Sequence, residues 1–261
     1  MWRILLARAR QGQRTIGFPD EPPTLPDRLR GRPTLDPSRC VDNCTACADA
    51  CPTGAIAAEP GKLALDLGRC LFCTDCTSAC PAGAISYTSE YRLSARRRED
   101  LVLGDNGDAL APRQRALDEA TRRMFGRSLK LRVVSAGGCN GCEADVNVLG
   151  TIVFDLGRFG IQYVASPRHA DGLLVTGAVS ANMRLALKKT YDAVPPPKIV
   201  IAVGACAISG GPYIGHPEVE GGAGAVVPVD LYIAGCPPHP ITILDGLLAM
   251  LDRIPPSRRA T

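Results

Sequence analysis

Cysteines are the side chains of this sequence best placed to do chemistry, because they recur at regular spacing. The densest group, residues 70–80, has the pattern CxxCxxCxxxC followed by proline. Residues 40–51 are a near copy, and the repeat extends past each fourth cysteine, since PTGAI at 52–56 matches PAGAI at 81–85. Cysteines at this spacing are typical ligands of 4Fe-4S clusters. A duplication of this length predicts two similar halves that fold against each other.

A third group of cysteines is spread over the second half of the chain. Cys139 and Cys142 form a glycine-rich CxxC, and Cys206 and Cys236 each follow an apolar, β-branched run, as Cys139 also does. Such runs predict buried strands of a parallel sheet, whose carboxyl ends lie at one edge. We therefore expect these four cysteines to meet around a buried 4Fe-4S cluster. The alternative of four unrelated core cysteines leaves their shared position after strands unexplained.

Glycines accompany this third group. Gly138, Gly204 and Gly235 stand one or two residues before a cysteine, where a missing side chain allows the backbone to approach a bulky inorganic core. Backbone N–H groups of residues 137–141 are expected to hydrogen-bond the sulfurs of that core and to set its reduction potential.

Composition and charge limit the classes of protein. The 261 residues are 46% hydrophobic, which suits two modest domains. A net charge of +4 and 5% aromatic residues do not indicate nucleic acid binding. The first ten residues hold only a short apolar patch between arginines and no twin-arginine pattern, so they predict neither a signal peptide nor a membrane span. We expect a reducing cytoplasm, where clustered cysteines more often bind metal than form disulfides.

Four segments are predicted along the chain: an N-terminal arm at 1–33, a two-cluster domain at 34–92, a connector at 93–129 and a second domain at 130–261. The second domain alternates strand and helix patterns, which predicts a doubly wound α/β fold with a parallel sheet. The expected strands are 131–135, 161–165, 172–177, 198–203 and 227–233, and the expected helices are 143–157, 180–192 and 239–253.

The arm and the connector carry weaker signals. Residues 1–10 predict a short helix with one apolar and one basic side. This helix either rests on a bilayer surface or a membrane subunit, or it is a frayed terminus that docks on a partner. The proline-rich segment 17–39 predicts an extended course over another surface. In the connector, 112–125 predicts a helix within a basic stretch, which is either a solvated face or is seated on an acidic neighbour.

The first two cysteine runs resemble the two-cluster bacterial ferredoxins, in which the fourth cysteine of each run serves the other cluster. This resemblance implies a ferredoxin-like α+β domain. Its ligand sets would be Cys40, Cys44, Cys47 and Cys80 for one cluster, and Cys70, Cys73, Cys76 and Cys51 for the other. Three residues rather than two separate Cys40 from Cys44, so the extra residue must bulge; without Cys40, a three-iron cluster or a substitute ligand is expected. Zinc ribbons need CxxC pairs about fifteen to twenty residues apart, which these uninterrupted runs do not provide.

The second half resembles the small subunit of membrane-bound group 4 NiFe hydrogenases, which include the formate hydrogenlyase and energy-converting types. The blocks that carry the resemblance are GCNGCE at 138–143, SPRHAD at 166–171, LLVTG at 173–177, VGACA at 203–207 and VPVDLYIAGCPP at 227–238. The first hundred residues resemble the ferredoxin-like subunit of the same complexes, so the chain resembles a fusion of two neighbouring subunits. A sister family, the complex I subunit that bears the last cluster before quinone, shares these blocks but begins its motif with two adjacent cysteines instead of CxxC.

The hydrogenase resemblance implies a proximal third 4Fe-4S cluster on Cys139, Cys142, Cys206 and Cys236. Electrons would pass from the two ferredoxin clusters through it to a nickel-iron centre in a partner large subunit. All twelve cysteines are then assigned, so this chain is expected to transfer electrons and to hold no nickel. The other partners implied are a further electron-input subunit or ferredoxin and membrane subunits, at the cytoplasmic face of the membrane. Alternatives are a complex I-like quinone oxidoreductase subunit and a soluble two-cluster ferredoxin with a docking domain.

The sequence leaves the roles of the polar residues near the third group open. Glu143 and Asp145 either complement the N-terminus of a helix or relay protons from the nickel site. Arg168 and His169 either lie beside the cluster and favour its reduced state or form an ordinary loop salt bridge. His239, which follows Cys-Pro-Pro, is a candidate for titration coupled to reduction.

Overall fold

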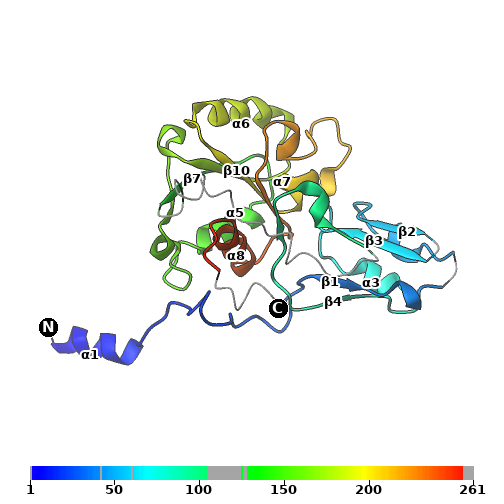
Figure 1. Cartoon of the computed structure of the whole chain (residues 1–261), viewed down its shortest axis with the longest axis horizontal. Coiled ribbons are helices and arrows are strands. Elements are labelled where there is room, and N and C mark those ends of the chain that lie inside the picture. The colour runs from blue at the N-terminus through cyan, green and yellow to red at the C-terminus, as the bar shows by residue number, and fades with distance from the viewer. Residues whose placement is uncertain (1, 42, 60, 105–124, 126–127, 255–261) are drawn as a thin grey trace.

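Two parts of the protein lie side by side in the computed structural model (Figure 1). The structure describes residues 2–41, 43–59, 61–104, 125 and 128–254. The larger part is built around a six-stranded sheet, and the smaller part, on the right of Figure 1, contains short strands and helices. A helix at the N-terminus projects away from both.

The six-stranded sheet has the strand order β5-β11-β10-β9-β7-β8. Its strands are β5 (Ser94–Ala95), β7 (Leu129–Ser135), β8 (Ile161–Tyr163), β9 (Gly172–Thr176), β10 (Ile199–Val203) and β11 (Leu231–Ile233). The five strands from β7 to β11 pair in parallel, and β5 pairs antiparallel with β11. Numbered along the chain from β7, the parallel strands follow the order 2-1-3-4-5 of flavodoxin-like folds. The predicted α/β class with a doubly wound second domain is confirmed.

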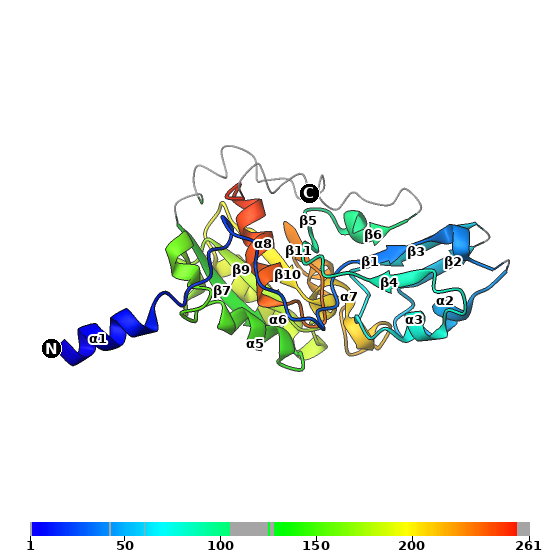
Figure 2. The same cartoon turned by 90° about the horizontal axis from the view of Figure 1, so that it is seen from below.

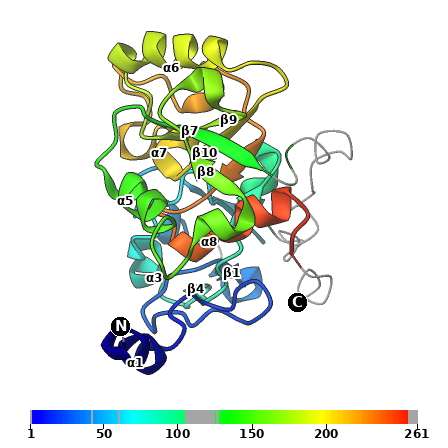
Figure 3. The ribbon, with the colours of Figure 1, turned by 90° about the vertical axis from the view of Figure 1, so that its left-hand side faces the viewer.

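Helices cover both faces of this sheet. They are α5 (Gly141–Val148), α6 (Ala181–Ala193), α7 (Ala205–Ser209) and α8 (Pro240–Met250). Figure 3 shows α6 on one side of the sheet and α5 and α8 on the other. Alternate residues of a strand face opposite sides: Leu173 and Val175 join a core cluster with Leu187 of α6, while Leu174 and Ile201 join the cluster that contains α8. Each face therefore has its own apolar core.

The predicted helices differ from the observed ones chiefly at 143–157. In the structure α5 ends at Val148, and a 3-10 helix follows at Leu156–Phe159. Gly150 and the β-branched residues after it disfavour a continued helix. The hydroxyl of Thr151 also donates to the Val148 carbonyl at 2.7 Å, which satisfies a group at the helix end. By contrast, α6 and α8 agree with the predicted segments to within three residues.

The smaller part reproduces the sequence duplication in space. Its elements are β1 (Pro33–Leu35), α2 (Ala46–Asp49), β2 (Ile56–Glu59), β3 (Lys62–Asp66), α3 (Asp75–Ala79), β4 (Ile85–Tyr87) and β6 (Val102–Leu103). β1 pairs antiparallel with β4, and β3 pairs antiparallel with both β2 and β6. The short helices α2 and α3 carry equivalent cysteines of the two runs and pack together. Two small halves thus fold against each other, as the duplication indicates.

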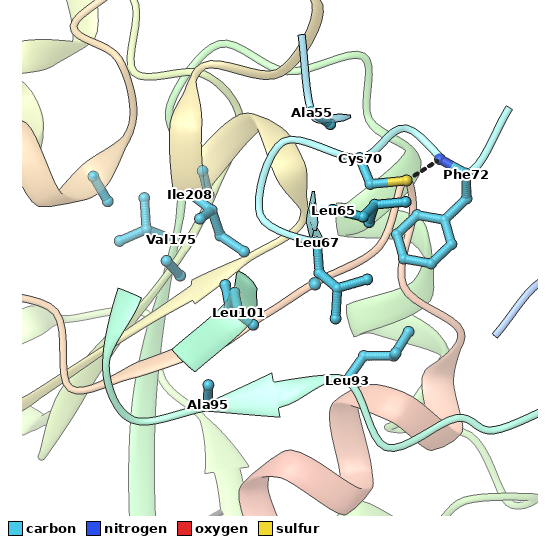
Figure 4. Close-up of a cluster of buried hydrophobic side chains, with 14 of the residues drawn as sticks. Ala55, Leu65, Leu67, Cys70, Phe72, Leu93, Ala95, Leu101, Val175 and Ile208 are labelled. Carbon is cyan, nitrogen blue, oxygen red and sulfur yellow. Dashed lines mark hydrogen bonds between the residues drawn. The ribbon is translucent and has the colours of Figure 1, made fainter. Parts of the chain in front are cut away.

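Residues 94–103 join the two parts. This segment adds β5 to the large sheet and then β6 to the small one. Between them, Arg98 donates to both carboxylate oxygens of Asp66, at 2.8 and 2.6 Å. One buried core runs across the junction, and Figure 4 shows Leu65 and Leu101 in the same cluster as Ile208. Part of the predicted connector therefore contributes strands to both sheets. The predicted helix 112–125 lies, except for Phe125, outside the described residues.

The N-terminal arm lies over the protein's own surface (Figure 2). Ile16 N–H donates to the Val153 carbonyl at 3.0 Å, which attaches the arm to the large part. Phe18 is buried and meets Tyr91 edge to face. Farther along, β1 pairs with β4 of the small part. The predicted extended course is thus anchored to both parts of the chain.

The first helix, α1 (Trp2–Gln11), stands apart from this packing. None of its residues is buried, and Trp2 is 79% exposed. In the part of the chain that the structure describes, no helix is both long enough and apolar enough to span a bilayer.

Removing the Arg98 guanidinium tests the junction. The side chains of Arg98 and Asp66 are 31% and 18% exposed, so Arg98→Ala leaves a partly buried carboxylate without its main partner. We expect a loss of about 1–3 kcal/mol in unfolding free energy, seen as a lower melting temperature by circular dichroism of the iron-loaded chain. Arg184→Ala is the control, because the Arg184 side chain is 65% exposed and lies 3.7 Å from its partner Glu220, a pair that contributes little. An equal loss in both variants would contradict the role of the junction.

Candidate metal centres

Three cysteines of the first run and the last cysteine of the second line one cavity of about 450 Å³. We call such a group of four cysteines a cage. The first cage consists of Cys40, Cys44, Cys47 and Cys80. Burial raises the pKa of the Cys47 thiol, and the neighbouring Cys80 thiolate raises it further, with a smaller effect from Cys40. The structure therefore brings together the crossed set that the ferredoxin resemblance implies.

The second cage is the reciprocal set, Cys51, Cys70, Cys73 and Cys76, which share one pocket with Tyr87. Burial raises the pKa of the Cys70 thiol to about 11, and Cys76 and Cys51 add repulsion. The Tyr87 hydroxyl lies 3.5 Å from the Cys70 sulfur and 3.9 Å from that of Cys76. Sequence reasoning did not find Tyr87. The signal available was its place two residues after the repeated PxGAI, where the first run has alanine.

The repeated PxGA segment has a local function at both fourth cysteines. Ala55 N–H donates to the Cys51 sulfur and Ala84 N–H donates to the Cys80 sulfur, each at 3.2 Å. The intervening glycine of each repeat adopts a positive φ, which turns the chain back toward the sulfur. Burial tends to raise the pKa of Cys80, but four backbone N–H groups, those of residues 82–85, lower it below the ordinary thiol value. Such donors stabilise a thiolate and tune any cluster that it holds.

The extra residue after Cys40 lies in the first half of its loop. Asn43 and Phe72, directly before Cys44 and Cys73, have matching left-handed φ values of +57° and +53°. The two loops therefore agree from these residues onward, and the insertion falls at Val41 or at position 42, which is outside the described residues. Val41 is 59% exposed.

The third cage forms at the carboxyl edge of the large sheet. Cys139 and Cys142 follow β7, Cys206 lies in α7 after β10, and Cys236 follows β11. Burial raises the pKa of the Cys142 thiol, and the thiolates of Cys206 and Cys236, the Glu143 carboxylate and Cys139 raise it further. Burial and the neighbouring thiolates raise that of Cys206 to about 11. Cysteines separated by up to 97 positions (139 to 236) thus come together.

Glycine is required beside this cage for different reasons at each position. Gly204 has φ +91°, and a Cβ there would lie 2.4 Å from the Cys142 sulfur. At Gly235 a Cβ would instead meet Pro238 Cα at 2.3 Å, and at Gly138 it would meet Gly177 Cα at 3.0 Å. The prediction that a missing side chain lets the backbone approach the cluster site thus applies to Gly204. Gly138 and Gly235 instead allow two backbone segments to pack closely against each other.

The carboxylate of Glu143 is fixed beneath the third cage. It accepts hydrogen bonds from the hydroxyls of Ser135 at 2.6 Å and Thr176 at 2.7 Å. Burial tends to raise the pKa of Glu143, but these two hydroxyl groups hold it below the ordinary value. Glu143 therefore remains ionised at neutral pH. This favours a positioning and electrostatic role over a proton relay at this residue.

Asp145 and His239 line one cavity together with Cys236. Burial raises the pKa of Asp145 and lowers that of His239. The His239 Nδ1 accepts the Ile241 N–H at 3.2 Å and so caps α8. Because its pKa is lowered from the ordinary value, His239 is neutral at pH 7.

The placement suggested for Arg168 and His169 beside the cluster is wrong. Both are exposed residues of a 3-10 helix that precedes β9. The next residues bring the chain to the start of β7, where Asp171 N–H donates to the Lys130 carbonyl at 2.7 Å. This is the amino edge of the parallel sheet, whereas the third cage lies at the carboxyl edge, a strand of several residues away at about 3.3 Å per residue.

All three cages suit iron-sulfur clusters in their donor chemistry. Each offers four thiols and backbone N–H groups or glycines around them. Among the described residues, no three or more His, Cys, Asp or Glu side chains are close enough to hold a single metal ion. A four-iron cube holds its thiolates farther apart than one tetrahedral ion does.

A flavodoxin-like domain with such cages, joined to a duplicated ferredoxin-like domain, defines an iron-sulfur protein of the electron-transfer class. Residues 139–250 match the family described as NADH ubiquinone oxidoreductase, 20 kDa subunit, and residues 39–84 match the 4Fe-4S dicluster domain. The chain belongs to this 20 kDa subunit family. The predicted resemblance, to a hydrogenase-type subunit joined to a two-cluster domain, is confirmed.

Three curated relatives are named as subunits of a membrane-bound hydrogenase, a formate hydrogenlyase and an NADH-quinone oxidoreductase. The chain is 40% identical over 132 residues to a probable membrane-bound hydrogenase subunit of Pyrococcus furiosus, covering 51% of this chain and 79% of the relative. It is 47% identical over 125 residues to formate hydrogenlyase subunit 7 of Escherichia coli, covering 48% of this chain and about half (49%) of that protein. An NADH-quinone oxidoreductase subunit of Clostridium beijerinckii is 43% identical over 114 residues, with 43% of this chain and 68% of the relative covered.

A solved structure, that of the membrane-bound sulfane sulfur reductase, an archaeal respiratory membrane complex, is 34% identical. The match covers 53% of this chain and 76% of the other, with a TM-score of 0.45.

Gly204→Ala tests the third cage. The added Cβ would clash with the Cys142 sulfur, so we expect the third cluster to be lost. The iron content should fall from about twelve to about eight atoms per chain. Iron analysis and EPR of the anaerobically purified protein measure this loss. Gly221→Ala is the matched control: Gly221 also has a positive φ, +78°, but a Cβ there meets nothing within 4 Å. It should keep all its iron, at a backbone cost of about 1–2 kcal/mol. A full iron content in Gly204→Ala would argue against this cage.

Proposed function

We propose that this chain is the electron-transfer subunit of a membrane-associated NiFe hydrogenase complex of the formate hydrogenlyase type. The observation that carries the proposal is the convergence of Cys139, Cys142, Cys206 and Cys236 at the sheet edge of a chain that also carries two ferredoxin cages. The relatives named as hydrogenase and formate hydrogenlyase subunits support it. Three 4Fe-4S clusters, held by the three sets of four cysteines, are part of the proposal, and so is the division at residues 33, 92 and 129.

The order of the cages gives a route. One cavity is lined both by Phe72, next to Cys73 of the second cage, and by Cys236 of the third, and the Cys73 thiolate contributes to the raised pKa of Cys236, so the second and third cages are neighbours. The first cage, between α2 and the β2–β3 hairpin, lies toward the far end of the small part (Figure 1). Clusters held in the three cages would therefore offer electrons a route along the chain, from the first cage through the second to the third, in either direction.

The protein contributes rigidity and electrostatics to this transfer. A bound 4Fe-4S cluster supplies one-electron redox chemistry, with a potential that depends on hydrogen bonds, charge and solvent exposure. Ala55 and Ala84 donate to ligand sulfurs, the Tyr87 hydroxyl faces two of them, and Glu143 adds fixed negative charge beside the third cage. The nickel-iron chemistry belongs, in this proposal, to a partner large subunit.

Further proposed partners are an electron-input subunit or ferredoxin at the first cage and membrane subunits, with the chain at the cytoplasmic face. The second candidate function is an iron-sulfur subunit of a quinone oxidoreductase, which the similarity to the NADH-quinone oxidoreductase relative favours. The Cys139-x-x-Cys142 spacing, rather than adjacent cysteines, favours the hydrogenase.

Cys139→Ala in the native complex tests the function. Loss of one thiolate should remove the third cluster, abolish hydrogen evolution and leave the EPR signals of the ferredoxin half intact. Cys47→Ala is the reciprocal variant and should remove the first cluster while the third stays. Anaerobic purification with nickel and iron counts and mass spectrometry identifies the partners. About eight irons per chain in the unaltered protein would select a two-cluster ferredoxin, and a bound quinone without nickel would select the complex I-like alternative.

Helix α1 supports attachment to an anionic membrane surface. The exposed side chains of Trp2, Leu5 and Leu6 share one face, and Arg3, Arg8 and Arg10 lie outside it. A helix of this composition binds at the lipid interface. Replacing Leu5 and Leu6 together by Glu should reduce binding of the full chain to vesicles with anionic phospholipid by at least about tenfold, as measured by cosedimentation.

The matched control for this test is Ala7→Glu with Gln11→Glu, which adds the same charge on the opposite side of α1. It should reduce binding much less, because the apolar face is retained. If both double variants lost vesicle binding equally, the added negative charge alone would explain the loss, and a role for the apolar face would be contradicted.

A further inference from the structure

The N-terminal arm places Arg30 between the second and third cages. Directly after it, Gly31 N–H donates to the Thr88 carbonyl and Arg32 N–H donates to the Glu90 carbonyl, both at 2.8 Å. A Cβ at position 31 would lie 2.2 Å from the Glu90 carbonyl oxygen, so only glycine allows this approach. The backbone beside Arg30 is therefore held tightly against residues 88–90.

The side chain of Arg30 reaches the loop of the second cage. Its Nη1 donates to the Phe72 carbonyl at 2.9 Å and lies 3.4 Å from the Cys73 carbonyl. The same loop turns back on its cage, because Phe72 N–H donates to the Cys70 sulfur at 3.3 Å (Figure 4). The guanidinium thus contacts the backbone of the loop that carries two proposed ligands of the second cluster.

A cavity of about 420 Å³ continues from this guanidinium to the third cage. Its lining includes Arg30, Phe72, Asp145, Cys236 and His239. Arg30 and Phe72 belong to one end of the electron step, and Cys236 belongs to the other. A cation here faces the gap across which the second and third cages exchange electrons.

Reduction adds one negative charge to a four-iron cluster, and a nearby fixed cation stabilises that charge. Arg30 is an exposed residue, so water screens part of its charge, but its hydrogen bond to the Phe72 carbonyl is partly buried and keeps the guanidinium close to the cluster loop. We infer that Arg30 is a positioning residue that stabilises the reduced state of the second cluster and holds its loop at the step to the third. This inference rests on the proposed electron-transfer function and adds a determinant of its energetics.

The test is an EPR-monitored redox titration of the purified complex with Arg30→Gln, which keeps a hydrogen-bond donor but removes the charge. At a fixed potential, the reduced-to-oxidised ratio of the second cluster should fall about tenfold, which is about 59 mV for one electron. The signal of the first cluster should not move. The second cluster is identified by the signal that disappears in Cys76→Ala.

Two further variants separate charge from contact. Arg30→Lys keeps the charge and should stay within about threefold of the unaltered ratio. Arg28→Gln removes an arginine of the same arm that lines the same cavity, and its effect should be less than about threefold because it is not the arginine seated on the loop. The inference would be overturned if Arg30→Gln left the ratio unchanged. It would also be overturned if Arg28→Gln or Arg30→Lys shifted the ratio as much as Arg30→Gln does.

Loss of the second cluster in Arg30→Gln would also overturn it, because Arg30 would then be a structural support. The inference and the proposed function fail in different ways. If all three EPR signals and the nickel-bearing partner are present while Arg30→Gln moves nothing, the function stands and the inference falls. If the unaltered complex lacks the third signal, the function itself fails.

Discussion

Crowding of thiols is the constraint on which the rest of this structure depends. In each cage, burial and neighbouring thiolates oppose ionisation, as the raised pKa values of Cys47, Cys70 and Cys142 show. Iron binds thiolates, so a bound cluster offsets this repulsion and the desolvation of the sulfurs. Short helices carry several of the cysteines, since Cys47 lies in α2, Cys76 in α3 and Cys206 in α7. A bound cluster would link these helices and the turns beside them, while the two sheets supply the rigid frame.

The frame fixes the spacing between the cages. Residues 94–103 add strands to both sheets, and the Arg98–Asp66 ion pair holds the turn that leads to Cys70, where Gly68 N–H also donates to Asp66 at 2.9 Å. On the other side, Ser209 of α7 donates to the Gly68 carbonyl at 2.9 Å. The loop before the second cage is thus held by both parts of the chain. Electron transfer between fixed sites benefits from such rigidity, because little rearrangement accompanies each step.

Sequence patterns predicted the cages and the large sheet because both depend on strong local signals. The four-cysteine runs and the β-branched strands lead directly to the ferredoxin repeat and to a doubly wound parallel sheet. Two-residue strands such as β5 leave no periodic pattern, so their pairing with the large sheet was not foreseeable. Arg168 and His169 were misplaced because a loop's sequence neighbourhood does not say which sheet edge it occupies. Tyr87 and Arg98 act through contacts with distant residues, which spacing does not encode.

The antiparallel edge strand β5 has a consequence for how the two halves recognise each other. It lies before residue 104 in the chain, yet it pairs with Tyr232 and Ile233 of β11 in the other half. Backbone hydrogen bonding to an open sheet edge is a general mode of association between separate polypeptides. If the chain were divided between residues 104 and 128, the amino-terminal piece would keep this strand. The contact that now operates within one molecule would then serve as the docking element of a two-chain assembly.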